Sequence, residues 1–258
     1  MPVVEHSARA NGRLLLDAAG DVVGAFELAE RDGQPLADIF ALADGVAPEA
    51  AAATVTTELK GWRVAAEEPF SRLLLAGGAR PLRHSHVMSR DLTRNPAPGE
   101  WLEPALPAGV RLAPVDRPAI DLVPALLAAF PSSHPDYGHI KDPEHPEHEL
   151  EELLSGSLLG PLLRCSTLAI AEDGGVVGAI LVNGKAGDPP FDGPWIADVF
   201  RRPDTPGVGG ALLKRSLAIA TRDRLPAVGL AVTHTNPAMA TYAAHVFDDV
   251  LNVLNVEV

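Results

Sequence analysis

"DTPGVGGALLKRSLAIA", from Asp204 to Ala220, places three glycines directly before a predicted amphipathic helix. Glycine loses more conformational entropy on folding than any other residue, so this cluster needs a structural or functional reason. Behind the glycines, Leu213, Leu217 and Ala220 recur at the spacing of one helix face. Pro226 follows, and a proline there predicts that the helix ends before it. The stretch therefore predicts a helix whose first turn is kept free of side chains.

A predicted strand, "WIADVF" at residues 195–200, leads into this turn. The first N–H groups of a helix have no partner inside the helix, and the helix dipole adds positive potential there. A strand, a glycine turn and a helix together therefore favour a bound phosphate. Gly207, Gly209 and Gly210 would let such a group approach the backbone. Glycine turns before helices are common, so this turn alone does not identify a ligand site, and further evidence must come from the remainder of the sequence.

The elements around the turn predict a mixed α/β sheet. The run "VGLAVTH" at residues 228–234 is typical of a strand buried on both faces. Two β-rich runs flank Asp173-Gly174-Gly175 and predict a hairpin over 167–182. Further patterns predict a strand at 109–115, helices at 118–130, from 147 and from 237, and a closing strand at 250–258. The resulting order, β-α-α-β-β-β-α-β-α-β, fits neither a Rossmann fold nor a barrel.

Residues 109–258 resemble the GNAT superfamily of acyl-CoA-dependent N-acetyltransferases. The resemblance rests on a strand ending at Val199, the Gly-x-Gly turn, Asn-Pro-Ala at 236–238, Tyr242 and Phe247. It implies the GNAT fold, in which helices flank a central mixed β-sheet.

Two positions depart from the family pattern. Asp204 stands where the family has Gln or Arg, and Val246 replaces the glycine before the phenylalanine. Asp204 places a negative charge beside the expected pyrophosphate, and Arg201 and Arg202 are near enough in sequence to compensate it.

The resemblance implies acetyl-CoA as cosubstrate and indicates where it would bind. Its pantetheine arm would lie in a gap between the strand ending at Val199 and the strand at 228–234, against backbone near Phe200. Asn236 matches a cofactor-contacting position and equally fits a helix cap, and the two roles are compatible. The implied cofactor-binding residues are Val199, Phe200, Arg201, Gly207, Val208, Gly209, Gly210, Ala211 and Asn236.

Two residues are candidates for catalysis. Tyr242 matches the family's general acid, which protonates the departing thiolate; its alternative role is packing on the sheet. Period-2 alternation predicts that Asp198 shares a strand face with Ile196 and Phe200. A carboxylate in an apolar strand can have the raised pKa that a general base needs. Asp198 is therefore the predicted base, with a salt bridge, an acceptor-binding carboxylate or a water chain as alternatives.

Together these features predict direct transfer of an acetyl group from acetyl-CoA to a primary amine of a small molecule or peptide. The first alternative is a non-catalytic CoA-binding module, because Asp204 is atypical and the base is not fixed. The second, a nucleotide-dependent oxidoreductase, would need its glycines early in a βαβ unit, whereas here they come late. The identity of the amine acceptor stays open.

A histidine-rich segment invites a metal site. His134, His139, His145 and His148 lie among acidic residues, but prolines interrupt them and no helical His-x-x-x-His spacing occurs. We therefore predict a solvated acidic loop and no metal. In the family this region helps to cover the acceptor site, so Asp136 and Tyr137 are candidates to meet an amine. The one cysteine, Cys165, begins a strand and is expected to be buried and unreactive.

The first ninety residues echo the last ones. Shifted by 168 positions, Pro69 aligns with Pro237 and Leu74 with Tyr242. This predicts a tandem protein, similar in plan to mycothiol synthase, whose first unit lacks the glycine turn and binds no CoA. A proline-rich stretch between the two suggests a linker. The predicted ranges are a degenerate GNAT-like domain at 1–92, a linker at 93–108 and an N-acetyltransferase domain at 109–258.

Composition limits the partners and the location. The net charge of −13 argues against nucleic acid, since an acidic surface repels phosphate backbones. No apolar run approaches the length of a membrane span. A single cysteine rules out an intrachain disulfide, and a reducing, cytoplasmic location is expected. The oligomeric state stays open, with a homodimer as one option.

Overall fold

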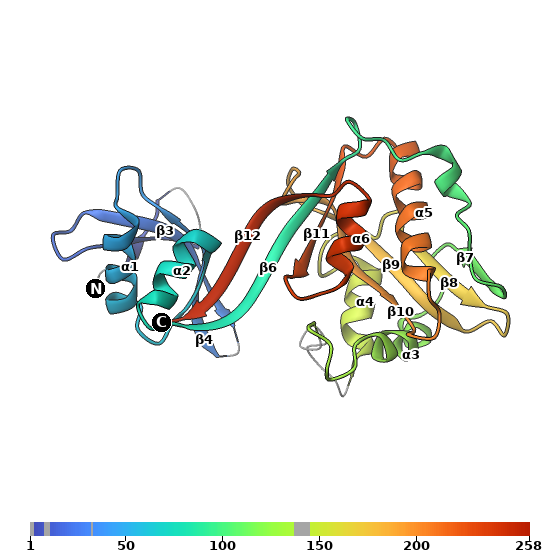
Figure 1. Cartoon of the computed structure of the whole chain (residues 1–258), viewed down its shortest axis with the longest axis horizontal. Helices are drawn as coiled ribbons and strands as arrows, with labels where there is room; N and C mark the ends of the chain where they lie inside the picture. The colour runs from blue at the N-terminus through green and yellow to red at the C-terminus, as the bar shows by residue number, and fades with distance from the viewer. Residues whose placement is uncertain (1–2, 8–10, 32, 137–144) are drawn as a thin grey trace. The chain divides into compact units, whose positions relative to one another are not determined.

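Figure 1 shows a computed structural model of the chain, which describes residues 3–7, 11–31, 33–136 and 145–258. The chain forms two compact units. The first comprises Met1–His86 and Leu251–Val258, and the second comprises Val87–Val250. These units differ from the ranges predicted from the sequence, because the last eight residues group with the N-terminal part. No described helix is long and apolar enough to cross a membrane.

The first unit is a sheet covered by two helices. Its elements are β1 (Val3–Glu5), β2 (Gly12–Leu16), β3 (Val22–Arg31), β4 (Gln34–Leu42), α1 (Pro48–Glu58), β5 (Arg63–Glu67), α2 (Glu68–Ala76) and the start of β6 (Arg80–Asp91). The first four strands pair antiparallel, and α1 then crosses over so that β5 runs parallel to β4. The final strand of the chain, β12 (Asp248–Glu257), pairs antiparallel with β5 and extends this sheet.

Aromatic rings fill the core of the first unit. Phe40 stacks on Phe26 at 6.3 Å between ring centroids and on Phe70 at 5.2 Å. Residues of β12 belong to the same core, since Leu254 and Val256 are buried in it. The Ser71 hydroxyl on α2 donates a hydrogen bond to the Leu254 carbonyl at 2.7 Å. The last strand is therefore an integral part of the N-terminal unit.

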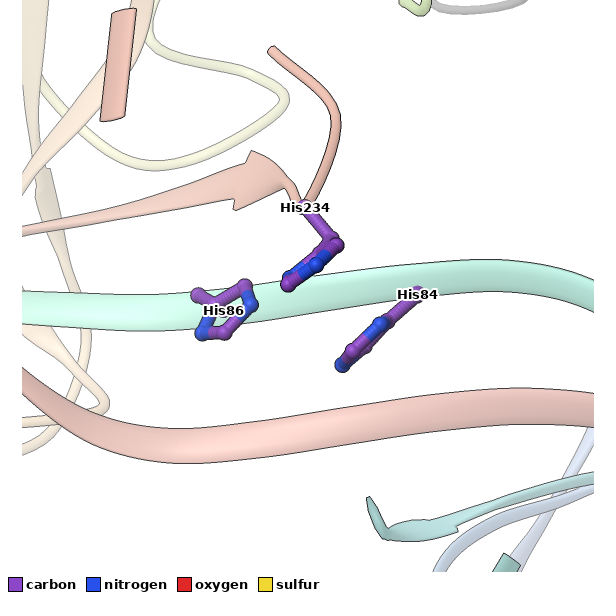
Figure 2. Close-up of side chains that lie close together, drawn as sticks. All are labelled: His84, His86 and His234. Atoms are coloured by element: carbon purple, nitrogen blue, oxygen red, sulfur yellow. The ribbon is translucent and has the colours of Figure 1, made fainter. Parts of the chain in front are cut away.

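Two histidines lie on the part of β6 that belongs to the first unit. His84 and His86 are two residues apart and so share one face of the strand, with ring centroids 5.1 Å apart (Figure 2). His84 also hydrogen-bonds Asn252 on β12. The third labelled side chain in Figure 2, His234, belongs to the second unit.

The second unit is a mixed sheet with helices on both faces. Its elements are the end of β6, a 3-10 turn at Gly99–Leu102, β7 (Val110–Ala113), α3 (Ala119–Ala129), α4 (Glu147–Ser155), β8 (Thr167–Ala171), β9 (Val176–Lys185), β10 (Gly193–Arg201), α5 (Val208–Arg222), β11 (Ala227–Thr233), α6 (Ala238–Ala244) and the start of β12. Its strand order is β6-β11-β10-β9-β8-β7. The β10–β11 pair is parallel, whereas β10–β9, β9–β8 and β8–β7 are antiparallel. The predicted fold class and the hairpin over 167–182 are confirmed.

Two apolar clusters cover the two faces of this sheet. Leu212, Leu213 and Leu217 of α5 pack against Ile180 and Val182 of β9 on one face. On the other face, residues of α3 and α4 such as Leu122 and Leu150 pack against Leu181. Alternate residues of β9 therefore face different helices, which is why its sequence "VVGAILV" is a nearly continuous apolar run.

The two halves of the chain share one order of elements. The segment β4-α1-β5-α2-β6 repeats as β10-α5-β11-α6-β12, with a parallel crossover at α1 and at α5. The last strands are exchanged: β12 of the second repeat pairs with β5, and β6 of the first repeat neighbours β11. The repeat expected from the sequence is thus present in the structure, with its final strands interchanged.

Candidate functional site

The turn before α5 needs glycine at one position for conformational reasons. Gly207 is the N-cap of α5 and has φ 85°, in the left-handed region that residues with a Cβ rarely adopt. The Thr205 hydroxyl donates to the carbonyl of Arg202 at 2.7 Å and closes the preceding turn. Gly207 is therefore explained by the backbone alone.

Gly209 and Gly210 have no such explanation. Both lie in the first turn of a regular helix, and neither has a positive φ. A Cβ on Gly209 would meet only Arg201 Cδ, at 3.8 Å, and a Cβ on Gly210 would meet nothing within 4 Å. Alanine would fit both positions and would stabilise the helix. Neither conformation nor packing within the described chain requires these two glycines, so the open space on this turn is the feature to explain.

The backbone donors of this turn are available to a ligand. No side chain caps α5, and no described group accepts a hydrogen bond from the N–H of Gly209 or Gly210. The N–H of Ala211 donates to the carbonyl of Gly207 at 3.1 Å, so it is used inside the helix. Val208 is fully buried in the core and anchors the turn. Free donors at the positive end of a helix, with no side chain in front of them, suit a phosphate.

The charges around the turn are arranged by two arginines. Arg202 donates two hydrogen bonds to the Asp204 carboxylate, from Nε to Oδ1 at 3.2 Å and from Nη2 to Oδ2 at 2.9 Å. The unusual acidic residue is thus paired with a positive charge. Arg201 donates from Nη1 to the carbonyls of Arg202 and Pro203, at 2.8 and 3.0 Å, which holds its own charge beside Gly209.

The parallel strands β10 and β11 meet at one position. Across the described residues, their one register pair is Trp195 with Gly229. A Cβ on Gly229 would lie 2.8 Å from ring atoms of Trp195, so glycine is required for this close contact. Val199 and Phe200 lie beyond the paired position, where the register of β10 with β11 does not continue. This agrees with the separation of the two strands that the resemblance implied.

A β-bulge changes the orientation of Asp198. The register between β10 and β9 shifts between Ile196 and Asp198. As a result Ile196 packs on the α5 face, whereas Asp198 pairs with Leu181, which lies on the α3–α4 face. The prediction that Ile196, Asp198 and Phe200 share a face is wrong for Ile196, because strict alternation does not hold across the extra residue. Asp198 is 8% exposed and faces the side of the sheet that carries α3 and α4.

A second carboxylate comes from the loop after α3. Asp136 accepts hydrogen bonds from the hydroxyl of Thr233, at the end of β11, and from Asn236 Nδ2, at 2.6 Å. Asn236 Oδ1 in turn accepts from the N–H of Ala238 at 2.8 Å, an Asx turn that leads into α6, whose N-cap is Pro237. Sequence reasoning singled out Asp136 and Asn236 separately but had no signal that joins residues a hundred positions apart, and it missed Thr233.

Tyr242 is buried at the same end of the unit. It is 7% exposed, and its ring lies edge-on to Phe247 at 5.8 Å between centroids. Burial raises the pKa of the Tyr242 hydroxyl above its usual range, and the negative charges of Asp198 and Asp136 raise it further. The phenol therefore stays protonated at neutral pH and is able to donate.

The sequence also singled out a cysteine and a histidine-rich segment. Cys165 is 1% exposed, and burial raises the pKa of its thiol to about 11, as expected for a packing residue. The rings of His145 and His148 stack at 5.1 Å. His139 and Tyr137 lie outside the described residues. The absence of a metal stays a prediction.

Comparison with known proteins identifies the fold. No family model and no curated protein matches the sequence. Among solved structures, a GCN5-related N-acetyltransferase from Sphaerobacter thermophilus has a TM-score of 0.65 at 18% identity, covering 95% of this chain and 79% of that one. A tandem GNAT protein from the clavulanic acid biosynthesis pathway has a TM-score of 0.55 at 19% identity, covering 95% and 81%. A GCN5-related N-acetyltransferase from Kribbella flavida has a TM-score of 0.51 at 14% identity, covering 91% and 86%. The chain therefore has the GNAT fold in a tandem arrangement.

Proposed function

We propose that this protein is an N-acetyltransferase that moves an acetyl group from acetyl-CoA to a primary amine by direct transfer. The observation that carries the proposal is the first turn of α5. Two glycines there are required by neither conformation nor packing, and their N–H groups have no acceptor among the described residues. In a GNAT fold this turn is where the pyrophosphate of CoA would bind.

The proposed cofactor site extends from this turn along β10. The N–H groups of Gly209 and Gly210 would donate to the pyrophosphate, with the charge of Arg201 beside them. Gly207, Val208 and Ala211 shape the turn. The pantetheine arm would hydrogen-bond backbone near Val199 and Phe200, which lies beyond the single paired position of β10 and β11. Asn236, at the start of α6, would lie on the opposite side of the arm.

The proposed reaction forms one bond and breaks one. The amine nitrogen attacks the thioester carbonyl, a C–N bond forms, and the C–S bond breaks. Asp198 takes the proton that the acceptor ammonium must lose before attack. Tyr242, which is protonated at neutral pH, gives its proton to the departing thiolate. The nitrogen loses its second proton as the amide forms, and the Tyr242 phenolate takes up that proton.

Calorimetric titration with acetyl-CoA tests the proposal. We expect micromolar binding to the wild-type protein and its loss in Gly209→Glu, which places a carboxylate in front of the free N–H groups. Gly99→Glu is the matched control, because Gly99 is exposed, lacks positive φ and has open space where a Cβ would stand. Gly99 lies in the segment beside the C-terminal end of α5, since neighbouring Ala97 hydrogen-bonds Thr221.

Three outcomes separate the explanations. Binding that is lost only in Gly209→Glu supports the cofactor site. Binding that survives in Gly209→Glu would place acetyl-CoA elsewhere. No binding by the wild-type protein at millimolar acetyl-CoA would refute the proposed function.

A further inference from the structure

The helix that carries Tyr242 ends in a Schellman motif. The N–H of Phe247 donates to the Tyr242 carbonyl at 3.2 Å, and the N–H of Val246 donates to the Ala243 carbonyl at 3.0 Å. The rings of Tyr242 and Phe247 also meet edge-on, at 5.8 Å between centroids. Both the backbone and the ring of Tyr242 are therefore held by the residues that close α6.

This motif needs a residue in the left-handed conformation just after the helix, and valine is poorly suited to it. Val246 has φ 58° and is 45% exposed, so packing of its side chain does little to compensate. A β-branched residue in the left-handed region is strained, and it persists only where surrounding contacts impose that conformation. A contact from outside α6 is therefore expected to hold the backbone at Val246.

The repeat within the chain shows which position changes together with Val246. Helix α2 of the first unit ends in the same motif, with Gly78 at φ 101° in the left-handed position. The shift of 168 positions aligns Gly78 with Val246, and it aligns Val258 with Arg90. The repeat that has glycine after the helix thus has valine at the second position, whereas the repeat that has valine after the helix has arginine there. This paired difference points to Arg90.

Arg90, at the end of β6, supplies the expected contact. It is 3% exposed, and its Nη1 donates to the carbonyl of His245, the residue directly before Val246, at 2.6 Å. Its Nε and Nη2 both donate to the Asn95 carbonyl, at 3.1 and 2.9 Å. The guanidinium lies 5.3 Å from the centroid of the Trp101 ring, and that ring meets the His245 ring edge-on at 5.3 Å. His245 is therefore held through both its carbonyl and its ring.

The segment that Arg90 joins to α6 has hydrogen bonds of its own. The N–H of Asn95 donates to the Asp91 carbonyl at 3.0 Å. The Asp91 carboxylate accepts from the N–H groups of Thr93 and Arg94, at 2.8 and 3.0 Å. All of these residues belong to the second unit. Arg90 therefore connects the end of α6 to a turn whose shape does not depend on α6.

We propose that Arg90 is a positioning residue for Tyr242. By holding the His245 carbonyl it keeps Val246 in the left-handed conformation, and the closed turn then fixes the ring of Tyr242. The inference rests on the proposed function, in which Tyr242 protonates the departing thiolate. Arg90 acts through Tyr242 and has no chemical role of its own.

Arg90→Met tests the proposal by the kinetics of thiol release from acetyl-CoA. The acceptor is the primary amine that reacts fastest with the wild-type protein, from a panel of alkylamines, amino sugars and lysine peptides. We expect kcat to fall about 10- to 100-fold, the effect of a small displacement of a catalytic group. The Kd for acetyl-CoA should change by less than about twofold, because Arg90 contacts none of the proposed cofactor-binding residues. If Arg90→Met does not fold, Arg90→Lys replaces it throughout, since lysine keeps the charge but lacks the planar fork that joins two carbonyls.

Rescue by glycine separates positioning from general stability. In the Arg90→Met background, Val246→Gly should restore kcat to within about threefold of the wild type, because glycine adopts a positive φ without an external contact. Arg224→Gly is the matched control, since Arg224 has φ 60° in the same motif after α5 and does not contact Arg90. It should raise the Tm without restoring kcat. Rescue by both variants, or by neither, would overturn the inference.

A double-mutant cycle tests whether Arg90 acts through Tyr242. In the Tyr242→Phe background, Arg90→Met should lower kcat by less than about threefold, because the group that it positions is already absent. A further loss of about tenfold or more would give Arg90 a role independent of Tyr242 and would overturn the inference.

Amide hydrogen exchange measures the same contact without any acceptor. The N–H of Phe247 should exchange about tenfold faster or more in Arg90→Met, and Val246→Gly should restore its protection. If the wild-type protein releases thiol but exchange at Phe247 does not respond to Arg90→Met, the inference alone has failed. If the wild-type protein releases no thiol with any amine of the panel, the proposed function has failed and the inference falls with it.

Discussion

Replacing Gly209 and Gly210 by alanine should make the protein more stable and less able to bind acetyl-CoA. Both glycines have helical backbone geometry and room for a Cβ. At such positions Gly→Ala stabilises by about 0.4–1 kcal/mol, because it reduces the entropy of the unfolded chain. The double variant should therefore gain about 1–2 kcal/mol, which corresponds to a rise in Tm of roughly 2–8 °C for a chain of this size.

Binding should change in the opposite direction. Two methyl groups would stand in front of N–H groups that have no acceptor among the described residues. Loss of a hydrogen bond to a charged group weakens binding by about 1.5–3 kcal/mol, or about 10- to 100-fold in Kd. Thermal unfolding without ligand measures the first effect, and calorimetric titration with acetyl-CoA measures the second.

Gly207→Ala provides the contrast. Its φ of 85° makes a Cβ unfavourable by about 1–2 kcal/mol, so this variant should lose stability where the double variant gains it. The reasoning is refuted if the double variant binds acetyl-CoA as tightly as the wild-type protein, because the space would then serve no ligand. It is also refuted if the double variant is less stable, because the two glycines would then be needed by the fold.

Three further predictions concern other parts of the chain. Tyr242→Phe should lower kcat by about 10²–10⁴-fold with the Kd for acetyl-CoA unchanged, as measured by thiol release and calorimetry, and an unchanged kcat would exclude it as general acid. Cys165 should react with Ellman's reagent only after unfolding, and labelling of the native protein at neutral pH would contradict its burial. The free energy of unfolding should fall as pH rises from about 9 toward 11, because the Cys165 thiol ionises at a lower pH in the unfolded chain than in the folded one. Ser71→Ala should lower the free energy of unfolding by about 1–3 kcal/mol, because the buried Leu254 carbonyl loses its donor, and a chemical denaturation curve that matches the wild type would show that this hydrogen bond contributes nothing.

The sequence predicted local structure well. The hairpin around Gly174 and the helix that starts at the glycine turn both form where periodicity and turn residues place them. These features depend on neighbours within one element, which the sequence displays directly. The reason for the glycines, by contrast, required the structure. Gly207 has a positive φ that favours glycine, whereas Gly209 and Gly210 do not.

Two features could not be predicted, for different physical reasons. The bulge at Ala197 carries no glycine or proline signal, so alternation predicted the wrong neighbour for Asp198. The contact of Asp136 with Asn236 joins positions a hundred residues apart through tertiary packing, which no local pattern encodes. The bulge and the long-range contact both lie in the candidate site. The geometry of such a site depends on the positions of single residues, which the periodicity of a helix or strand does not predict.

The exchange of the last strands has a consequence for synthesis on the ribosome. The strand β5 is complete at Glu67, but its partner β12 ends only at Glu257. At about 5–20 residues per second, translation takes roughly 10–40 s to cover that interval. Throughout it, the newborn N-terminal unit lacks Leu254 and Val256 from its core and presents an open edge at β5. Nascent copies on neighbouring ribosomes could pair at that edge, so we expect the yield of soluble protein to depend on translation speed and on chaperones that bind the incomplete chain.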